Sequence, residues 1–175
     1  IAKFEILNTI LGGNPNSRLF TDLREKQKLA YRVRSHVDFM DKTGVLTLSI
    51  KTTTDNPLEG NNKLDNLKKS LKGFDTNTAK MQNELVTDEE LESAKLYLKT
   101  KILDNAETSS GKNSLLNKSK HTAYGIDFPN LLLEEIDKIT KDDIKATANY
   151  IFQNPSLTSI VASQKTLDYF KNSIN

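Results

Sequence analysis

Residues 29–39 alternate between apolar and polar side chains, and this alternation restricts the fold more than any other feature of the chain. One set of alternate positions carries Tyr31, Val33, Ser35, Val37 and Phe39, and the positions between them carry Arg32, Arg34, His36 and Asp38. A period of two is that of a β-strand with one wetter face. The turn residues 41–44 (Asp-Lys-Thr-Gly) and the apolar residues that follow predict a hairpin whose second strand covers residues 45–53.

Helical patterns surround this hairpin. Residues 2–11 repeat apolar side chains at helical spacing, and Gly12-Gly13 predicts a left-handed stop to that helix. A second short helix, capped by Asn16 or Ser17, runs to about Lys26.

The central part of the chain predicts further helices. Asn56-Pro57 opens a helix with an apolar stripe that reaches Phe74, and we expect Gly73 and the polar residues 75–84 to interrupt it. Residues 108–120 predict a loop or a weak helix. Thr87 with Glu90 forms a capping box, and Thr140 caps a later helix.

The last strand is predicted at residues 157–162 (Leu-Thr-Ser-Ile-Val-Ala), where it must pair with a distant part of the chain. The fold class is therefore α+β, an antiparallel sheet of a few strands with helices packed mainly on one face. We interpret residues 1–175 as a single domain. Because the chain opens at Ile1 in mid-helix, we expect it to be an N-terminally truncated fragment of a longer protein.

Composition excludes several classes of protein. The net charge of +2 lacks the basic excess of a nucleic-acid binder, and the absence of cysteine excludes disulfides and thiolate zinc sites. His36 and His121 stand in no zinc-binding motif, and Glu89-Glu90 is explained by helix capping. No apolar run approaches the length of a membrane span, which favours a soluble chain, whether cytoplasmic or exported.

The densest charge signal is a basic cluster that spans the end of the second helix and the start of the hairpin. It consists of Arg24, Lys26, Lys28, Arg32 and Arg34. Such a cluster is usually a solvated surface. Arg24 nevertheless stands about two helical turns before Tyr31, so that a guanidinium and a phenol could grip a carbonyl or carboxylate together. The competing interpretation is that Tyr31, in phase with Val33, belongs to the core.

Several segments of the sequence, in order, resemble a known family. They are Leu11-Gly12-Gly13, Ser17-Arg18-Leu19-Phe20, Leu23-Arg24-Glu25-Lys26, Leu29-Ala30-Tyr31, Glu89-Glu90-Leu91 with Ala94-Lys95, Ala123-Tyr124-Gly125 and residues 139–144. Together they look like the C-terminal, non-catalytic domain of insulinase/pitrilysin-type zinc metallopeptidases. One position departs from the family, because the residue before Leu29 is commonly Gly in relatives and is Lys28 here.

The resemblance implies a fold, a partner and a role. The fold would be that of domains related to mitochondrial processing peptidase. A homologous N-terminal domain, in the same chain or on a partner subunit, would carry the zinc in a His-x-x-Glu-His motif. The domain described by this chain would hold no metal and would close a chamber around a peptide substrate. The two family positions that contact the peptide fall on Arg24 and Tyr31.

Three hypotheses follow. The leading one is a substrate-binding domain of a zinc endopeptidase, inactive when alone. The second is a non-catalytic assembly or scaffold subunit related to these peptidases. The third is an anion- or nucleic-acid-binding module that uses the basic cluster, which salt-sensitive binding would reveal.

Overall fold

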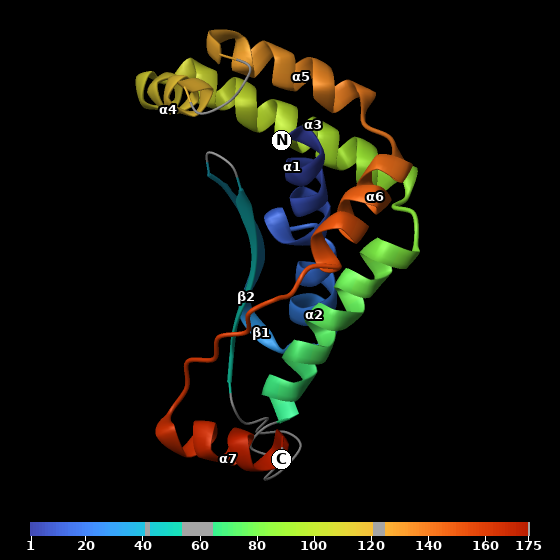
Figure 1. Ribbon diagram of the computed structural model, residues 1–175, viewed down its shortest axis with the longest axis vertical. Helices are drawn as coiled ribbons and strands as arrows, with labels where there is room; N and C mark the ends of the chain where they lie inside the picture. Colours follow the sequence, from blue (N-terminus) through green and yellow to red (C-terminus); the bar gives the residue numbers. More distant parts are fainter. Residues whose placement is uncertain (41–42, 54–64, 121–124, 175) are drawn as a thin grey trace.

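The structure is a computed structural model that describes residues 1–40, 43–53, 65–120 and 125–174 (Figure 1). The elements in chain order are α1 (Ala2–Asn8), the π-helical segments η1 (Thr9–Gly13) and η2 (Phe20–Lys26), β1 (Ala30–Phe39), β2 (Gly44–Thr52), α2 (Asp65–Asn83), α3 (Asp88–Glu107), α4 (Ser109–Lys120), the short 3₁₀ segment η3 (Gly125–Asp127), α5 (Phe128–Lys138), α6 (Lys141–Phe152) and α7 (Gln164–Ile174). The fold is a mostly helical α+β arrangement, which confirms the predicted fold class.

The predicted hairpin is confirmed. Strands β1 and β2 pair antiparallel, with Val33 opposite Ile50 and Val37 opposite Leu46. Val33 and Val37 are buried, whereas Arg34 and His36 are exposed, so the hairpin has one covered and one open face. Figure 1 shows α1, α2 and α6 on the covered side of the hairpin.

The predicted third strand is wrong. Residues 153–163 adopt no strand in the structure, and the sheet formed by the described residues contains β1 and β2 alone. Leu157 and Val161 are each 96% exposed. An apolar alternation becomes a strand only where a neighbouring strand accepts its backbone hydrogen bonds, and no described strand pairs with this segment.

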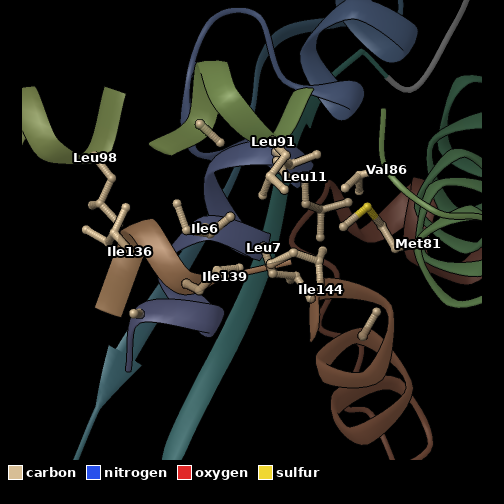
Figure 2. Close-up of a cluster of buried hydrophobic side chains, with 14 of the residues drawn as sticks. Ile6, Leu7, Leu11, Met81, Val86, Leu91, Leu98, Ile136, Ile139 and Ile144 are labelled. Carbon is tan, nitrogen blue, oxygen red and sulfur yellow. The ribbon is translucent and has the colours of Figure 1, made fainter. Parts of the chain in front are cut away.

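One apolar core lies between α1, η1 and the helices around them (Figure 2). Ile6, Leu7 and Leu11 of the first helical segments are fully buried at its centre. Met81 from α2, Leu91 and Leu98 from α3, and Ile136, Ile139 and Ile144 from the α5–α6 region surround them. No described helix is both long enough and apolar enough to cross a membrane.

Both predicted capping motifs are confirmed. Thr87 accepts a hydrogen bond from the backbone N–H of Glu90, and the Glu90 carboxylate accepts one from Thr87 N–H. Thr140 and Asp143 make the same reciprocal pair at the start of α6. These side chains satisfy backbone donors that a helix N-terminus otherwise leaves free.

Two predictions about helices need correction, and one alternative is settled. Helix α2 continues through Gly73 to Asn83. Of the loop or weak helix predicted at residues 108–120, the structure has the helix, α4. The predicted start of α2 at Asn56-Pro57 lies outside the described residues. Gly12 does not have positive φ, so it is not a left-handed stop. A Cβ on Gly12 would lie 2.5 Å from the backbone N of Ser35, which means that this glycine lets β1 approach η1 closely.

Candidate functional site

Helix η2 presents Arg24 on the surface beside an aromatic ring. The Arg24 guanidinium carbon lies 4.6 Å from the ring centroid of Phe20, within cation–π range. Phe20 and Arg24 are four residues apart in sequence, which places both side chains on the same face of the helix. Arg24 is exposed and Phe20 is half-buried, so the ring forms a platform that restricts the guanidinium.

A left-handed residue connects η2 to β1. Lys28 has φ of 54°, the only positive value at a described non-glycine residue. The turn is closed by a hydrogen bond from Leu29 N–H to the Leu23 carbonyl, 2.9 Å between N and O. The backbone immediately before Arg24 therefore lies against the backbone two residues before Tyr31.

Tyr31 occupies a β-bulge at the start of β1. Ala30 is opposite Thr52 and Arg32 is opposite Lys51, so Tyr31 is the extra residue on its strand. Its side chain is 82% exposed, whereas Val33, two residues later, is 5% exposed. The interpretation of Tyr31 as a core residue is therefore wrong, because the bulge breaks the alternation just where the tyrosine stands.

The turn from η2 into β1, residues 24–31, forms a corner of the molecule, and it presents the side chains of both Arg24 and Tyr31 to solvent. No hydrogen bond joins the Arg24 and Tyr31 side chains, and neither makes an ion pair with a described residue. A guanidinium and a phenolic O–H can both donate hydrogen bonds to a peptide carbonyl or a carboxylate.

Helix α2 supports this corner from behind. The Asn77 amide donates to the Asp22 carboxylate at 2.7 Å, and also to the Gly73 carbonyl at 2.8 Å. A Cβ on Gly73 would overlap the side chain of Leu23, so the glycine lets η2 and α2 meet. Asp22 and Leu23 directly precede Arg24, which means that α2 fixes the backbone that carries the arginine.

A second support comes from α3. Arg18, two residues before η2, makes a bidentate ion pair with Glu90, with Nε–Oε1 at 2.7 Å and Nη2–Oε2 at 2.8 Å. Burial opposes the charged form of Glu90. Hydrogen bonds from Arg18 and from the Thr87 backbone outweigh that effect and lower the pKa of the carboxyl. Glu90 therefore stays ionised and holds both the α3 cap and the start of the η2 segment.

The sequence patterns did not indicate that Phe20, Asp22, Gly73 and Asn77 support the site. Only the four-residue spacing between Phe20 and Arg24 was visible in the sequence as a pairing signal. The contacts from α2 join residues fifty or more positions apart, and no local pattern indicates them.

The described residues do not fit a zinc ion. No group of three His, Asp or Glu side chains comes together within the part of the chain that the structure describes. His36 is exposed and lies 3.1 Å from Asp38, as a strand histidine on the solvent side would. His121 lies outside the described residues.

A second surface feature lies at the other end of β1. Phe4 makes edge-to-face contacts with Phe39 and Tyr150, and a shallow hollow runs beside it between α1 and α6. The ion pair between Lys3 and Asp143 crosses this hollow at 2.7 Å. Its described lining holds no group of three metal-ligating side chains, and we keep Arg24 and Tyr31 as the candidate site.

Comparison with known proteins identifies peptidases as relatives of this chain. The profile of the Peptidase M16 inactive domain family matches residues 1–98. An uncharacterized zinc protease of Rickettsia felis is 35% identical over 160 residues, which cover 91% of this chain and 36% of that protein. An uncharacterized zinc protease of Rickettsia bellii is 32% identical over 166 residues, which cover 95% of this chain and 37% of that protein. The chain therefore spans little more than a third of these relatives.

Solved structures agree on the fold. A protease from Helicobacter pylori matches with a TM-score of 0.68 at 22% identity, and the match covers 86% of this chain and 34% of that one. The peptidase M16 inactive domain from Pseudomonas fluorescens matches with a TM-score of 0.66 at 22% identity, again over 86% of this chain and 34% of that one. Since the family profile matches more than half of its residues, the chain belongs to the Peptidase M16 inactive domain family.

Proposed function

We propose that this chain is the substrate-binding, chamber-closing domain of an M16 zinc endopeptidase, with the zinc on a homologous domain of the same protein or of a partner. The observation that carries the proposal is the exposure of Tyr31 at a bulge, next to a helix that holds Arg24 over Phe20. Bulges frequently re-aim a side chain beside an active site. An 82% exposed tyrosine at the start of a strand gains nothing from packing.

The role of the two side chains follows from their chemistry. Arg24 offers a planar, permanently charged fork, and Tyr31 offers a single O–H donor. Together they hold the carbonyl groups of an extended peptide and orient the bond to be cut. Donors aimed at a carbonyl oxygen that gains negative charge are each worth about 3–4 kcal/mol in acyl-transfer enzymes.

The test is activity of the assembled peptidase, this chain together with the zinc-bearing domain, after Arg24→Ala and after Tyr31→Phe. We expect each substitution to lower turnover of a peptide substrate by about 10²-fold while the melting temperature stays within a few degrees. Lys26→Ala and Tyr97→Phe are the matched controls, since both residues are exposed and lie outside the site.

Two results would contradict the proposal. If the Arg24 and Tyr31 variants cleave peptides as well as the controls do, these residues do not bind the substrate. If no zinc-bearing partner exists and the assembly is inactive with the natural sequence, the chain is a scaffold subunit.

A further inference from the structure

The open face of the hairpin carries a run of cations that continues away from Tyr31. Arg32 and Arg34 of β1 and Lys51 of β2 are all exposed and lie on the face opposite the buried Val33. The register sets Arg32 directly opposite Lys51, and Arg34 opposite Ser49. In Figure 1 the helices α1, α2 and α6 leave this face of the hairpin uncovered.

No ion pair within the described part of the chain neutralises these cations. None of the three makes an ion pair with a described residue, and the acid nearest in sequence on that face, Asp38, lies 3.1 Å from His36 farther along β1. The chain as a whole has 25 basic and 23 acidic residues, so the lack of described ion pairs on this face does not follow from an overall shortage of acids.

This arrangement costs stability. Like charges directly opposite each other on neighbouring strands repel, and Arg32 faces Lys51 in that way. A solvated surface could place its cations apart or beside acids at no loss. A ligand with negative charge would relieve the repulsion and would gain an ion pair with each cation.

We propose that this face, defined by Arg32, Arg34 and Lys51, selects peptide substrates that carry acidic side chains beside the bond to be cut. The inference rests on the proposed function, since it assigns a substrate class to the same site. Because Tyr31 directly precedes Arg32, a peptide held at Tyr31 continues onto the cations. Arg32 and Arg34 stand two residues apart on one face, and alternate side chains of an extended peptide have the same spacing.

The test compares two peptides of equal length that differ only in Glu against Gln at the positions flanking the cleaved bond. With the assembled peptidase at low salt, we expect kcat/KM to be roughly tenfold higher for the Glu peptide, since exposed ion pairs are worth about two- to fivefold each. The ratio should fall severalfold at about 0.5 M salt, where exposed charges are screened.

A triple variant assigns the effect to the three cations. Arg32→Gln, Arg34→Gln and Lys51→Gln together should bring the ratio of the two peptides close to one. Lys80→Gln, Lys101→Gln and Lys112→Gln together remove the same charge from exposed positions elsewhere and should keep the ratio. Anisotropy of the labelled peptides with zinc-stripped enzyme measures the same preference as binding, without turnover.

Several outcomes would overturn the inference. They are equal kcat/KM and equal binding for the two peptides with the natural sequence, a preference that survives the triple variant, and a preference lost equally in the control. Tighter binding of a single-stranded oligonucleotide of equal charge would also overturn it and would favour a nucleic-acid surface. Failure of the proposed function itself is seen separately, as unchanged cleavage by the Arg24 and Tyr31 variants.

Discussion

At the scale of single residues, Lys28 and Tyr31 give the site its geometry. Lys28 takes a left-handed backbone conformation that ends η2, and three residues later Tyr31 is set aside from the strand register by a bulge. The left-handed conformation of Lys28 turns the chain from η2 into β1. The bulge points the phenol of Tyr31 into solvent. Regular helix followed directly by regular strand would place the tyrosine in phase with Val33, toward the core.

The left-handed conformation of Lys28 predicts that glycine is better there. The left-handed conformation costs a residue with a Cβ about 1–2 kcal/mol. Glycine avoids this cost, but its greater conformational freedom in the unfolded chain cancels part of the advantage. We expect Lys28→Gly to raise the free energy of unfolding by about 0.5–1 kcal/mol in urea titrations. Gln27→Gly is the control, since Gln27 has φ of −87° and needs no glycine. Equal destabilisation by both variants would contradict the argument.

At the scale of elements, local capping motifs determine where α3 and α6 begin. Helices α3 and α6 both start at a threonine whose partner three residues later is acidic, and both caps are closed reciprocally. Asp143 does more than cap α6, because it also accepts a hydrogen bond from Lys3 at 2.7 Å and so ties α6 to α1. Lys3 and the Thr140 cap lower the pKa of Asp143 from 3.8 to about 2.

That pKa predicts how the contribution of Asp143 to stability changes with pH. A carboxyl whose pKa is lowered by folding stabilises the protein above its unfolded pKa, and the stabilisation disappears as pH falls toward the folded value. Asp143→Asn should therefore lower the free energy of unfolding by about 0.5–1 kcal/mol at pH 7. The difference in free energy of unfolding between this variant and the natural protein should narrow between about pH 4 and pH 2. Asp142→Asn, in the same helical turn but outside the cap, should show a smaller and flatter difference. If the difference in free energy of unfolding stays constant down to pH 2, the lowered pKa of Asp143 does not contribute to stability.

The elements also show which features of the fold could be predicted from sequence. The hairpin, the capping box of Thr87 with Glu90 and the cap at Thr140 depend on residues within a few positions of one another, and they were predicted; the reciprocal contact of Asp143 with Thr140 was not. The continuity of α2 through Gly73 depends on Leu23 of η2, which fills the space that the glycine leaves. The bulge at Tyr31 depends on pairing with β2, and residues 157–162 are no strand because no described strand pairs with them. Arg24 and Tyr31 were visible as residue types at a spacing, but their supports are tertiary contacts.

At the scale of the whole molecule, the proposed function gives this chain the substrate-holding role and places the zinc chemistry on a homologous domain. It belongs to an inactive domain family, spans little more than a third of relatives described as zinc proteases, and gathers no three metal-ligating side chains among its described residues. What it does offer is a supported corner with two exposed donors and a basic strand face. Both features fit the proposed role of holding a peptide.

The proposed division of roles predicts which domain binds zinc and which combination of domains cleaves peptides. The purified chain should bind well under one zinc per molecule by elemental analysis after dialysis, because a stable zinc site needs about three or four positioned ligands. It should cleave no peptide when alone. Adding the homologous domain with the His-x-x-Glu-His motif should give zinc-dependent cleavage, and the same mixture made with the Arg24→Ala chain should be about 10²-fold slower. One tightly held zinc per chain, or cleavage by the chain alone that a chelator abolishes, would show that the catalytic site lies here and that the assignment of roles is reversed.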